Sequence, residues 1–253
     1  MASPLYTFSA YLGYRWRAVN AHGLHSPFMF ELYNKVIKKW DDQESNRLLQ
    51  HRQIDNPNQI IKYTDPRYLE DITTSVGRLA SRVASTHKFS YFLYKLINHM
   101  QYDRVLEAGT SLGINATYLG STKASRVWTM EGIEEIADLA IERFQKLEYD
   151  HVRVVKGLVE HTFRDSLGLN PDMIFIDADH RSEAIFWYLR IIKEMNIRPK
   201  CIIIHDIYWS RDMNKAWQQI VKDEQYSLTI DIFQAGIIFP DHPMEKQHFV
   251  VKF

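Results

Sequence analysis

From Arg104 to Lys222, short apolar runs alternate with amphipathic segments, and few folds accommodate that order. The predicted strands are Val105–Ala108, Arg126–Met130, Val152–Val155, Met173–Ile176 and Cys201–Ile204. The predicted helices that follow them are Asn115–Leu119, Ile133–Leu147, Leu158–Leu167, Ser182–Met195 and Asp212–Lys222. The longest intervening segment, Ile133–Leu147, repeats apolar residues at steps of three and four, which gives one apolar stripe. Such an alternation indicates a parallel sheet covered by helices on both faces.

The alternation stops near each end of the chain. SLTIDIF, GIIFP and QHFVVKF are strand-like with no helix between them, so an antiparallel hairpin is predicted to close the sheet. Upstream, helices are predicted over 27–39 behind a Ser26 cap, over RYLEDITTSVGRLASRV behind Asp65 and Pro66, and over KFSYFLYKLINHM. We therefore predict an N-terminal helical extension or lid over residues 1–100 and an α/β domain over 101–253.

Composition limits the partners. The 253 residues include 31 Lys and Arg and 31 Asp and Glu, so the chain lacks the basic excess typical of nucleic-acid binding. The single cysteine, Cys201, rules out an intrachain disulfide and fits a reducing compartment. No apolar run approaches the roughly 20 residues of a membrane span, and the first residues do not resemble a secretory signal. We expect a cytoplasmic protein with no nucleic-acid partner and no stable membrane insertion.

One strand is followed by a glycine turn. VLEAGTSLGINATYLG passes from an apolar run through Gly109 and Gly113 into a helical pattern. Glycine allows a sharp bend and a close ligand, and the free N–H groups of the new helix face the turn. The pattern Glu-x-Gly-x-x-x-Gly lacks the middle glycine of a dinucleotide fingerprint. An ordinary strand-to-helix turn is the alternative.

Polar residues follow every predicted strand, at the edge where open parallel sheets bind ligands. They are Glu107, Glu131, Gly157 with Glu160, Asp177 with Asp179 and His180, and His205 with Asp206. Glu131 follows Glu107 by 24 residues, a position from which a carboxylate can accept both hydroxyls of a ribose. Because the pyrophosphate fingerprint is incomplete, a nucleoside ligand without phosphates is favoured. Alternatively, Glu131 only complements the dipole of the helix that follows it.

The ordered set VLEAGTSLGINA, VWTMEG, KGLVE, PDMIFIDADH and IIIHDIYWS resembles class I S-adenosylmethionine-dependent methyltransferases. Within that class it is most similar to O-methyltransferases related to catechol O-methyltransferase and to antibiotic-tailoring enzymes, over residues 103–253. HGLHSPF and DIYWSRDMNKAW also resemble a group of bacterial proteins, notably from Bacteroidetes. The resemblance implies a Rossmann-like, mostly parallel seven-stranded sheet that binds S-adenosylmethionine. The implied reaction is methyl transfer to a small-molecule acceptor, at oxygen.

The resemblance also implies roles for individual residues. It places Glu107, Gly109 and Gly113 around the methionine part of the cofactor, with Thr110 and Ser111 lining the turn. Glu131 would bind the ribose, while Gly157, Leu158 and Glu160 would meet the adenine, and Asp177 matches the acidic residue after the fourth strand. In metal-dependent relatives an Asp-Asn pair joins that acid to hold magnesium, but here the pair is His205 and Asp206. Magnesium prefers oxygen ligands, so the metal is left open.

Without a metal, a side chain must deprotonate the acceptor, and the candidates are His205, Asp177, Asp206 and His180. His205 is preferred because it directly follows a strand and imidazole titrates near neutral pH. His180 could equally be a residue of a helix start. Two other functions are kept: a catalytically degenerate binding or scaffold protein, and a nucleotide-dependent oxidoreductase. Tyr91 and Lys95 match the Tyr-x-x-x-Lys pair of short-chain dehydrogenases, but that family places the pair after the glycine turn. Because the pair precedes the turn here, the oxidoreductase is disfavoured.

The N-terminal head is rich in aromatic and basic residues, namely Tyr6, Phe8, Tyr11, Tyr14, Trp16, Phe28, Phe30, Arg15, Arg17, His22 and His25. We expect residues 1–60 to cover the carboxyl ends of the strands and to form part of the acceptor pocket. Packing on the back of the sheet or in a homodimer interface is an equal alternative. The two histidines are expected to have structural or substrate-contacting roles rather than to bind metal.

Overall fold

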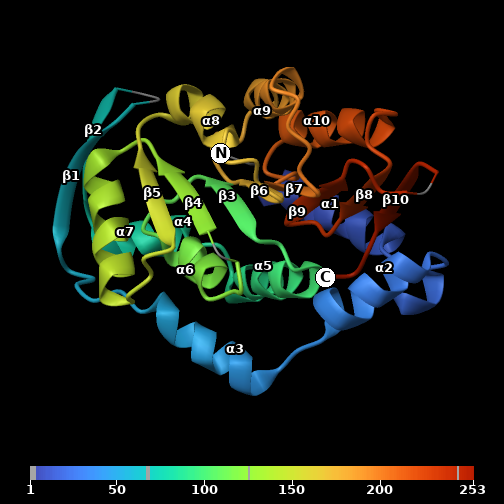
Figure 1. Cartoon of the computed structure of the whole chain (residues 1–253), viewed down its shortest axis with the longest axis horizontal. Coiled ribbons are helices and arrows are strands. Elements are labelled where there is room, and N and C mark those ends of the chain that lie inside the picture. The colour runs from blue at the N-terminus through green and yellow to red at the C-terminus, as the bar shows by residue number, and fades with distance from the viewer. Residues whose placement is uncertain (1–3, 67–68, 125, 244) are drawn as a thin grey trace. The chain divides into compact units, whose positions relative to one another are not determined.

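The computed structural model describes residues 4–66, 69–124, 126–243 and 245–253 (Figure 1). The chain forms two compact units. The first unit comprises Met1–Lys39 and Asn170–Phe253, and the second unit is Trp40–Leu169. The sequence predicts a different division, into an extension over residues 1–100 and a domain over 101–253. That division into domains stays a prediction.

The second unit contains the first half of the predicted alternation. Its parallel strands lie in the order β3-β4-β5, with bounds β3 (Arg104–Ala108), β4 (Arg126–Glu131) and β5 (Val152–Lys156). The helices after these strands are α6 (Ile114–Gly120), α7 (Glu134–Lys146) and α8 (Val159–Leu167). The apolar stripe of α7 buries Ile136, Ala137, Ala140 and Phe144, as the spacing predicts. Because the strands are parallel, their carboxyl ends share one edge.

The second unit also contains a β-hairpin where a helix was predicted. β1 (Ile60–Asp65) pairs antiparallel with β2 (Glu70–Ser75), so the predicted helix over 67–83 is wrong in its first half, and Arg67 and Tyr68 lie outside the described residues. The β-branched residues of both runs favour extended backbone, and Asp65–Pro66 leads into a turn rather than capping a helix. The cap is Ser75, whose side chain accepts from Arg78 N–H. The helices of this part are α3 (Asp42–Leu49), η3 (Gln50–Arg52), α4 (Val76–Val83) and α5 (His87–Met100).

The first unit holds the remaining strands in the order β10-β8-β9-β7-β6. Their bounds are β6 (Met173–Ile176), β7 (Cys201–His205), β8 (Leu228–Asp231), β9 (Ala235–Phe239) and β10 (Gln247–Val250). β6 and β7 are parallel, and β9 is antiparallel to both β7 and β8, which confirms the hairpin. β10 pairs in parallel with β8, so β3 to β10 are eight strands rather than seven.

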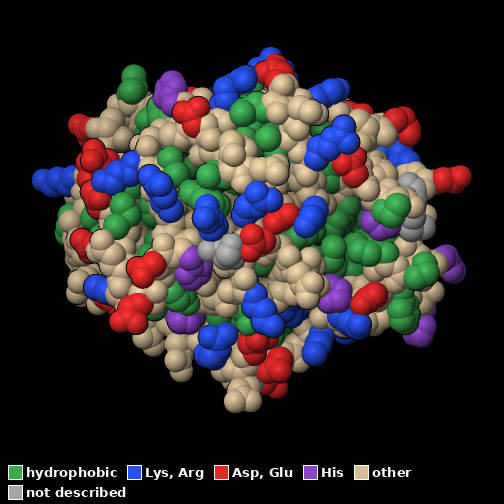
Figure 2. All heavy atoms as spheres, viewed as in Figure 1, with side chains coloured by type: hydrophobic (Ala, Val, Ile, Leu, Met, Phe, Trp, Pro, Cys, Tyr) green, Lys and Arg blue, Asp and Glu red, His purple; other side chains and the backbone are tan. Residues whose placement is uncertain are grey.

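The helices of the first unit come from both ends of the chain. They are α1 (Pro4–Arg17), η1 (Ala21–Gly23), α2 (Pro27–Leu32), the π-helical η2 (Tyr33–Lys38), α9 (Ser182–Glu194) and α10 (Arg211–Lys222). The Ser26 hydroxyl accepts from Met29 N–H, so the predicted cap forms, and the last turns of that predicted helix are π-helical. Among the described helices, none has the length and apolarity needed to cross a membrane. Lys, Arg, Asp and Glu side chains are interspersed on the face shown in Figure 2.

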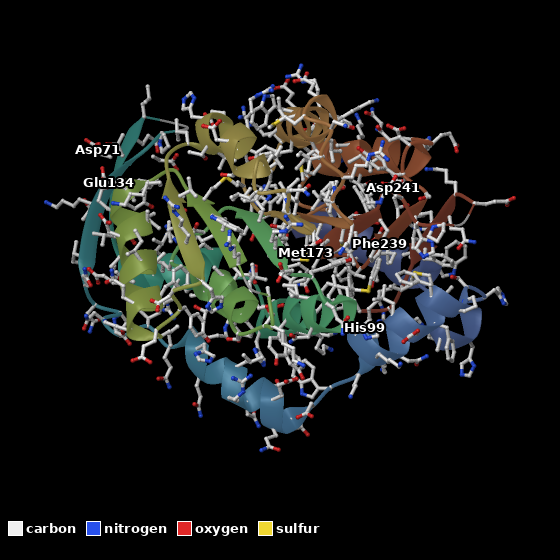
Figure 3. All side chains as sticks on the ribbon, viewed as in Figure 1. Asp71, His99, Glu134, Met173, Phe239 and Asp241 are labelled. Atoms are coloured by element: carbon white, nitrogen blue, oxygen red, sulfur yellow. The ribbon has the colours of Figure 1, made fainter. Side chains whose placement is uncertain are left out.

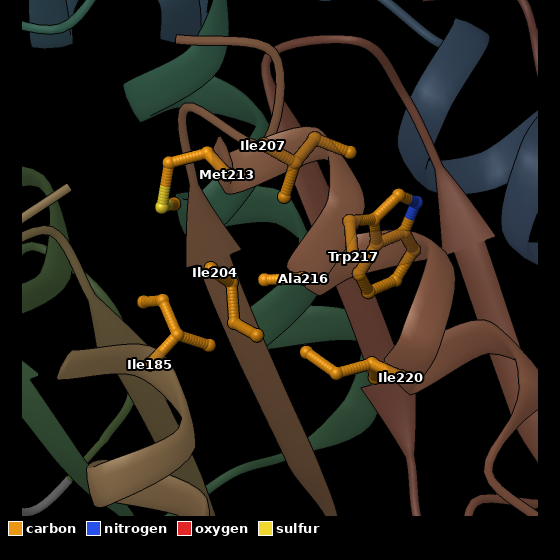
Figure 4. A pocket seen from close by; sticks show the side chains of 7 residues that line it. All are labelled: Ile185, Ile204, Ile207, Met213, Ala216, Trp217 and Ile220. Atoms are coloured by element: carbon orange, nitrogen blue, oxygen red, sulfur yellow. The ribbon is translucent and has the colours of Figure 1, made fainter. Parts of the chain in front are cut away.

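The core of the first unit is apolar. Met173 of β6 and Phe239 of β9, labelled in Figure 3, are both buried. Side chains of α9, α10, β7 and the segment after β7 line a small pocket (Figure 4), namely Ile185, Ile204, Ile207, Met213, Ala216, Trp217 and Ile220. All seven are apolar, so this pocket is a packing feature. Trp217 is buried and lies against Gly236, where a Cβ would collide with the indole ring.

Candidate active site

The glycine turn of the second unit is bound to the end of β4. Gly109 N–H and Thr110 N–H both donate to the Met130 carbonyl, at 3.1 and 2.9 Å. Gly109 has φ +106° and Gly113 has φ +71°, conformations that favour glycine. A Cβ on Gly113 would also lie 2.8 Å from Phe144 Cζ. The turn therefore needs both glycines for its own backbone and for the packing of α7.

Glu107 is a fully buried carboxylate inside the second unit. Asn115 Nδ2 donates to its Oε1 at 2.7 Å, and Thr129 Oγ1 donates to its Oε2 at 2.5 Å. The hydroxyls of Thr110 and Thr129 are 2.6 Å apart, so Thr110 donates to Thr129. A buried charge is tolerated only with such partners. Asn115 Oδ1 is itself a buried acceptor that has no hydrogen-bond partner among the described residues.

The partners of Glu107 do not emerge from sequence reasoning. Thr129 lies directly opposite Glu107 in the β3–β4 register, and Asn115 is in the first turn of α6. The available signal is a glutamate in an apolar strand, which must find donors if it is buried. Which side chains supply them depends on the register.

Glu131, at the end of β4, joins the turn to the next helix. Its Oε2 accepts from Ser111 N–H at 2.8 Å, and its Oε1 accepts from Ile133 N–H at 3.0 Å. Ser111 has φ +49°, uncommon for a residue with a Cβ. The bond to Ile133 is the helix-start role that the sequence left as an alternative, and the bond to Ser111 goes beyond it. Each carboxylate oxygen has two lone pairs, so an oxygen that accepts a backbone hydrogen bond is able to accept a second one.

The end of β5 lies against the end of β4. Gly157 has φ +129°, and its N–H donates to the Glu131 carbonyl at 2.9 Å. Leu158 is half-buried, and its Cδ2 would be 2.9 Å from a Cβ on Gly132. Glu160 is exposed in the first turn of α8. The glycine turn, Glu131, Gly157 and Leu158 thus lie together at the carboxyl ends of β3, β4 and β5. Glu160 lies on the surface.

The four candidate catalytic side chains cluster in the first unit. His205 Nδ1 is 2.8 Å from Asp177 Oδ1 and 3.7 Å from Asp206 Oδ2. His180 Nε2 lies 4.0 Å from Asp177 Oδ1 and 3.9 Å from Asp206 Oδ2. Asp179 instead binds the guanidinium of Arg181, at 2.6 and 2.5 Å. Two histidines therefore face the same two carboxylates.

The charges of this cluster change the protonation of His205. Burial by itself lowers the pKa of His205, but the adjacent Asp177 and then Asp206 more than offset it and raise the pKa to about 9. The ring is an imidazolium at neutral pH. Among the residues that the structure describes, no group of three or more His, Cys, Asp or Glu side chains is arranged to hold a metal ion.

Helix α1 lies at the carboxyl ends of β7 and β8. Tyr6 Oη donates to the Ser210 carbonyl at 3.2 Å, beyond β7. Arg17 donates to Tyr208 Oη at 2.9 Å, which donates to Asp231 at the end of β8 at 2.6 Å. These contacts place α1 beside the residues that follow β7 and β8, while the role of the head as a cover of the acceptor pocket stays a prediction.

The remaining side chains of interest in the first unit are a tryptophan after β7 and the two histidines of the head. The ring centroid of Trp209 lies 5.6 Å from that of His180. His22 and His25 are exposed.

Comparison with known proteins first defines the class of fold. No protein-family model matches the chain. A SAH-bound methyltransferase from Podospora anserina is 16% identical, with a TM-score of 0.56 over 81% of this chain and 98% of that chain. An O-methyltransferase from Bacillus cereus in complex with SAH is 20% identical, with a TM-score of 0.53 over 83% of this chain and 96% of that chain. The chain therefore has the Rossmann-like fold of class I methyltransferases.

A curated relative is similar in sequence. Catechol O-methyltransferase from Mycobacterium tuberculosis is 30% identical over 134 residues, which are 51% of this chain. The match spans about three fifths of that relative, 61% of its length.

Proposed function

We propose that this chain transfers a methyl group from S-adenosylmethionine to a hydroxyl of a small-molecule acceptor. The observation that carries the proposal is the carboxylate of Glu131 at the end of β4, tied to the glycine turn through Ser111 N–H. A carboxylate at this position can accept the hydroxyls of a ribose. Similarity to catechol O-methyltransferase supports transfer to oxygen.

The second unit has groups that fit the cofactor. Asn115 Oδ1 is a buried acceptor that a ligand ammonium group would satisfy. Around it, Glu107, Gly109, Thr110, Ser111 and Gly113 would hold the methionine part. Gly157 and Leu158 offer a partly apolar surface for the adenine, with Glu160 at its margin. Bound in this way, the cofactor would supply a methyl group on a sulfonium, which a nucleophile must approach in line.

The first unit supplies the proton acceptor. His205, oriented by Asp177 through its Nδ1, takes the proton of the acceptor hydroxyl when its ring is neutral. Because its pKa is raised to about 9, the neutral ring is a minor form at pH 7, and the rate rises with pH. Asp206 and His180 adjust the charge around His205. The resemblance also gives Asp177, the acidic residue after β6, a role in binding the cofactor.

We further propose that activity needs no magnesium, because a histidine stands where metal-dependent relatives use an acid. Activity measured after EDTA treatment should then equal activity with added magnesium. Loss of activity in EDTA with recovery in magnesium would contradict this. The paired carboxylates Asp177 and Asp206 would then be the residues to test as ligands.

Calorimetry with S-adenosylmethionine, S-adenosylhomocysteine and NAD tests the central proposal. We expect the first two to bind and NAD to give no heat. Binding of NAD alone would favour a nucleotide-dependent oxidoreductase. Cofactor binding without transfer to a broad acceptor panel would favour a catalytically degenerate scaffold.

We also propose a group of related proteins and a compartment for this chain. HGLHSPF and DIYWSRDMNKAW support grouping the chain with the Bacteroidetes proteins that share them. Equal numbers of acidic and basic residues, and the single cysteine, support a cytoplasmic enzyme that does not use nucleic acid.

A further inference from the structure

Helix α1 exposes an apolar face to solvent. Leu5, Phe8, Leu12 and Trp16 retain 81%, 62%, 53% and 92% of their surface. Their spacing of three, four and four residues places them on one side of the helix, and they are called the α1 stripe below. Contiguous exposed apolar surface of this kind marks interaction sites.

The opposite side of α1 holds the helix in place. Tyr14 is buried, and its hydroxyl bonds to the Val251 carbonyl and to Phe253 N–H. Tyr6 and Arg17, on the same side, bond to the segment that follows β7. The α1 stripe is therefore not needed to hold α1 in place. Contacts on the opposite side of the helix set the direction in which the stripe faces.

The charged side chains of α1 itself have one sign. No acidic residue occurs before Glu31, whereas Arg15 is exposed and borders the stripe between Phe8 and Trp16. Arginine can bury its stem along apolar surface and keep its guanidinium at a charged boundary. A tryptophan beside an arginine at one end of an apolar stripe is typical of a helix in the membrane–water interface.

A second copy of the chain fits the stripe less well. The stripe consists of four side chains, whereas each partner in a standard interface contributes roughly 20–30 residues. The same helix in a second copy would also bring only positive charge. A lipid surface has no minimum area, and anionic headgroups complement Arg15. We propose that the α1 stripe docks the protein peripherally on anionic membranes.

Vesicle co-sedimentation tests this proposal. The probes are phosphatidylcholine vesicles with and without phosphatidylglycerol. The full-length protein should sediment with the anionic vesicles and much less with the neutral ones. The double variant Phe8→Ser/Trp16→Ser should bind the anionic vesicles at least roughly tenfold more weakly. The matched control Phe30→Ser/Trp40→Ser, also at exposed aromatic positions, should bind as the wild type does.

A charge variant separates the two parts of the interaction. Arg15→Gln keeps the stripe and should reduce the preference for phosphatidylglycerol about fivefold. Circular dichroism confirms that each variant is folded, and sedimentation velocity gives its oligomeric state. The proposal is overturned if neither vesicle binds, if the stripe variant binds as the wild type does, or if the wild type is a dimer that the stripe variant dissociates.

Discussion

The carboxylate of Glu131 organises the end of β4 through two backbone N–H groups on different segments. Ser111 lies in the turn before α6, whereas Ile133 directly precedes α7. A single side chain therefore sets the distance between the glycine turn and the next helix. Any ligand that meets Glu131 meets a carboxylate whose orientation is already fixed, so little ordering cost remains on binding.

We predict that Glu131→Ala weakens S-adenosylmethionine binding by about 1.5 to 3 kcal/mol, because a charged hydrogen-bond acceptor is lost. Isothermal titration calorimetry gives the dissociation constant. The matched control is Glu134→Ala, in the first turn of α7, where only the helix dipole and an exposed ion pair with Lys156 are affected. An equal, small effect in both folded variants would remove Glu131 from the site.

The protonation of His205 depends on its neighbours. We predict that its ring titrates near pH 9 in the wild type, and below about 6.5 in Asp177→Asn, where burial is no longer offset by that carboxylate. Nitrogen-detected NMR of the imidazole follows both titrations without an acceptor. Asp179→Asn is the control, since Asp179 is bound to Arg181. A wild-type midpoint near 6.5 would contradict the assignment.

At the scale of elements, α1 is joined to the C-terminal segment after β10. Val19 N–H donates to the Val250 carbonyl and Lys252 N–H donates to the Val19 carbonyl, in the residues that follow α1. Tyr14 reinforces this join with two hydrogen bonds in a buried position. The two ends of the chain thus stabilise one another, and α1 is part of the folded first unit.

Tyr14→Phe should lower the free energy of unfolding by about 1 to 3 kcal/mol, because a buried carbonyl and a backbone N–H lose their partner while the ring volume is kept. Urea denaturation measures the change. Tyr11→Phe serves as the control, because Tyr11 is exposed. If both variants unfold at the same urea concentration as the wild type, the hydroxyl of Tyr14 does not stabilise the fold.

At the scale of the whole molecule, stability should decrease on mild acidification. Burial, then the nearby Arg17, lowers the pKa of His248 to about 4, although a hydrogen bond to the backbone of Thr229 opposes the shift. The folded protein therefore favours the neutral ring. This contribution is present above the unfolded pKa of about 6.5 and is lost as the pH falls toward 4.

Between pH 7 and pH 5, the shift of His248 should reduce the free energy of unfolding by about 2 kcal/mol. His248→Gln should reduce that pH dependence, whereas His22→Gln, at an exposed position, should retain it. Urea titrations at both pH values supply the measurement. An unchanged slope in His248→Gln would show that other groups account for the acid sensitivity.

Periodicity in the sequence was enough to predict β3 to β9, their helices and the hairpin β8–β9, since burial on one face or both leaves a regular pattern of apolar residues. It was not enough for β1 and β2. There Asp65–Pro66 has the chemistry of a cap and of a turn alike, and only pairing between Ile61 and Thr74 decides between them. The strand-end positions of Glu131, Asp177 and His205 likewise follow from local pattern.

Contacts between distant residues could not be obtained in the same way. Asn115 and Thr129 meet Glu107 through helix packing and strand register, and the pKa of His205 is raised first by Asp177, which lies 28 residues before it. The sequence by itself determined the fold class and the strand ends at which polar groups gather. Tertiary structure alone decided which of those groups touch, because a hydrogen bond or a charge interaction acts over a few ångströms between segments that sequence spacing does not bring together.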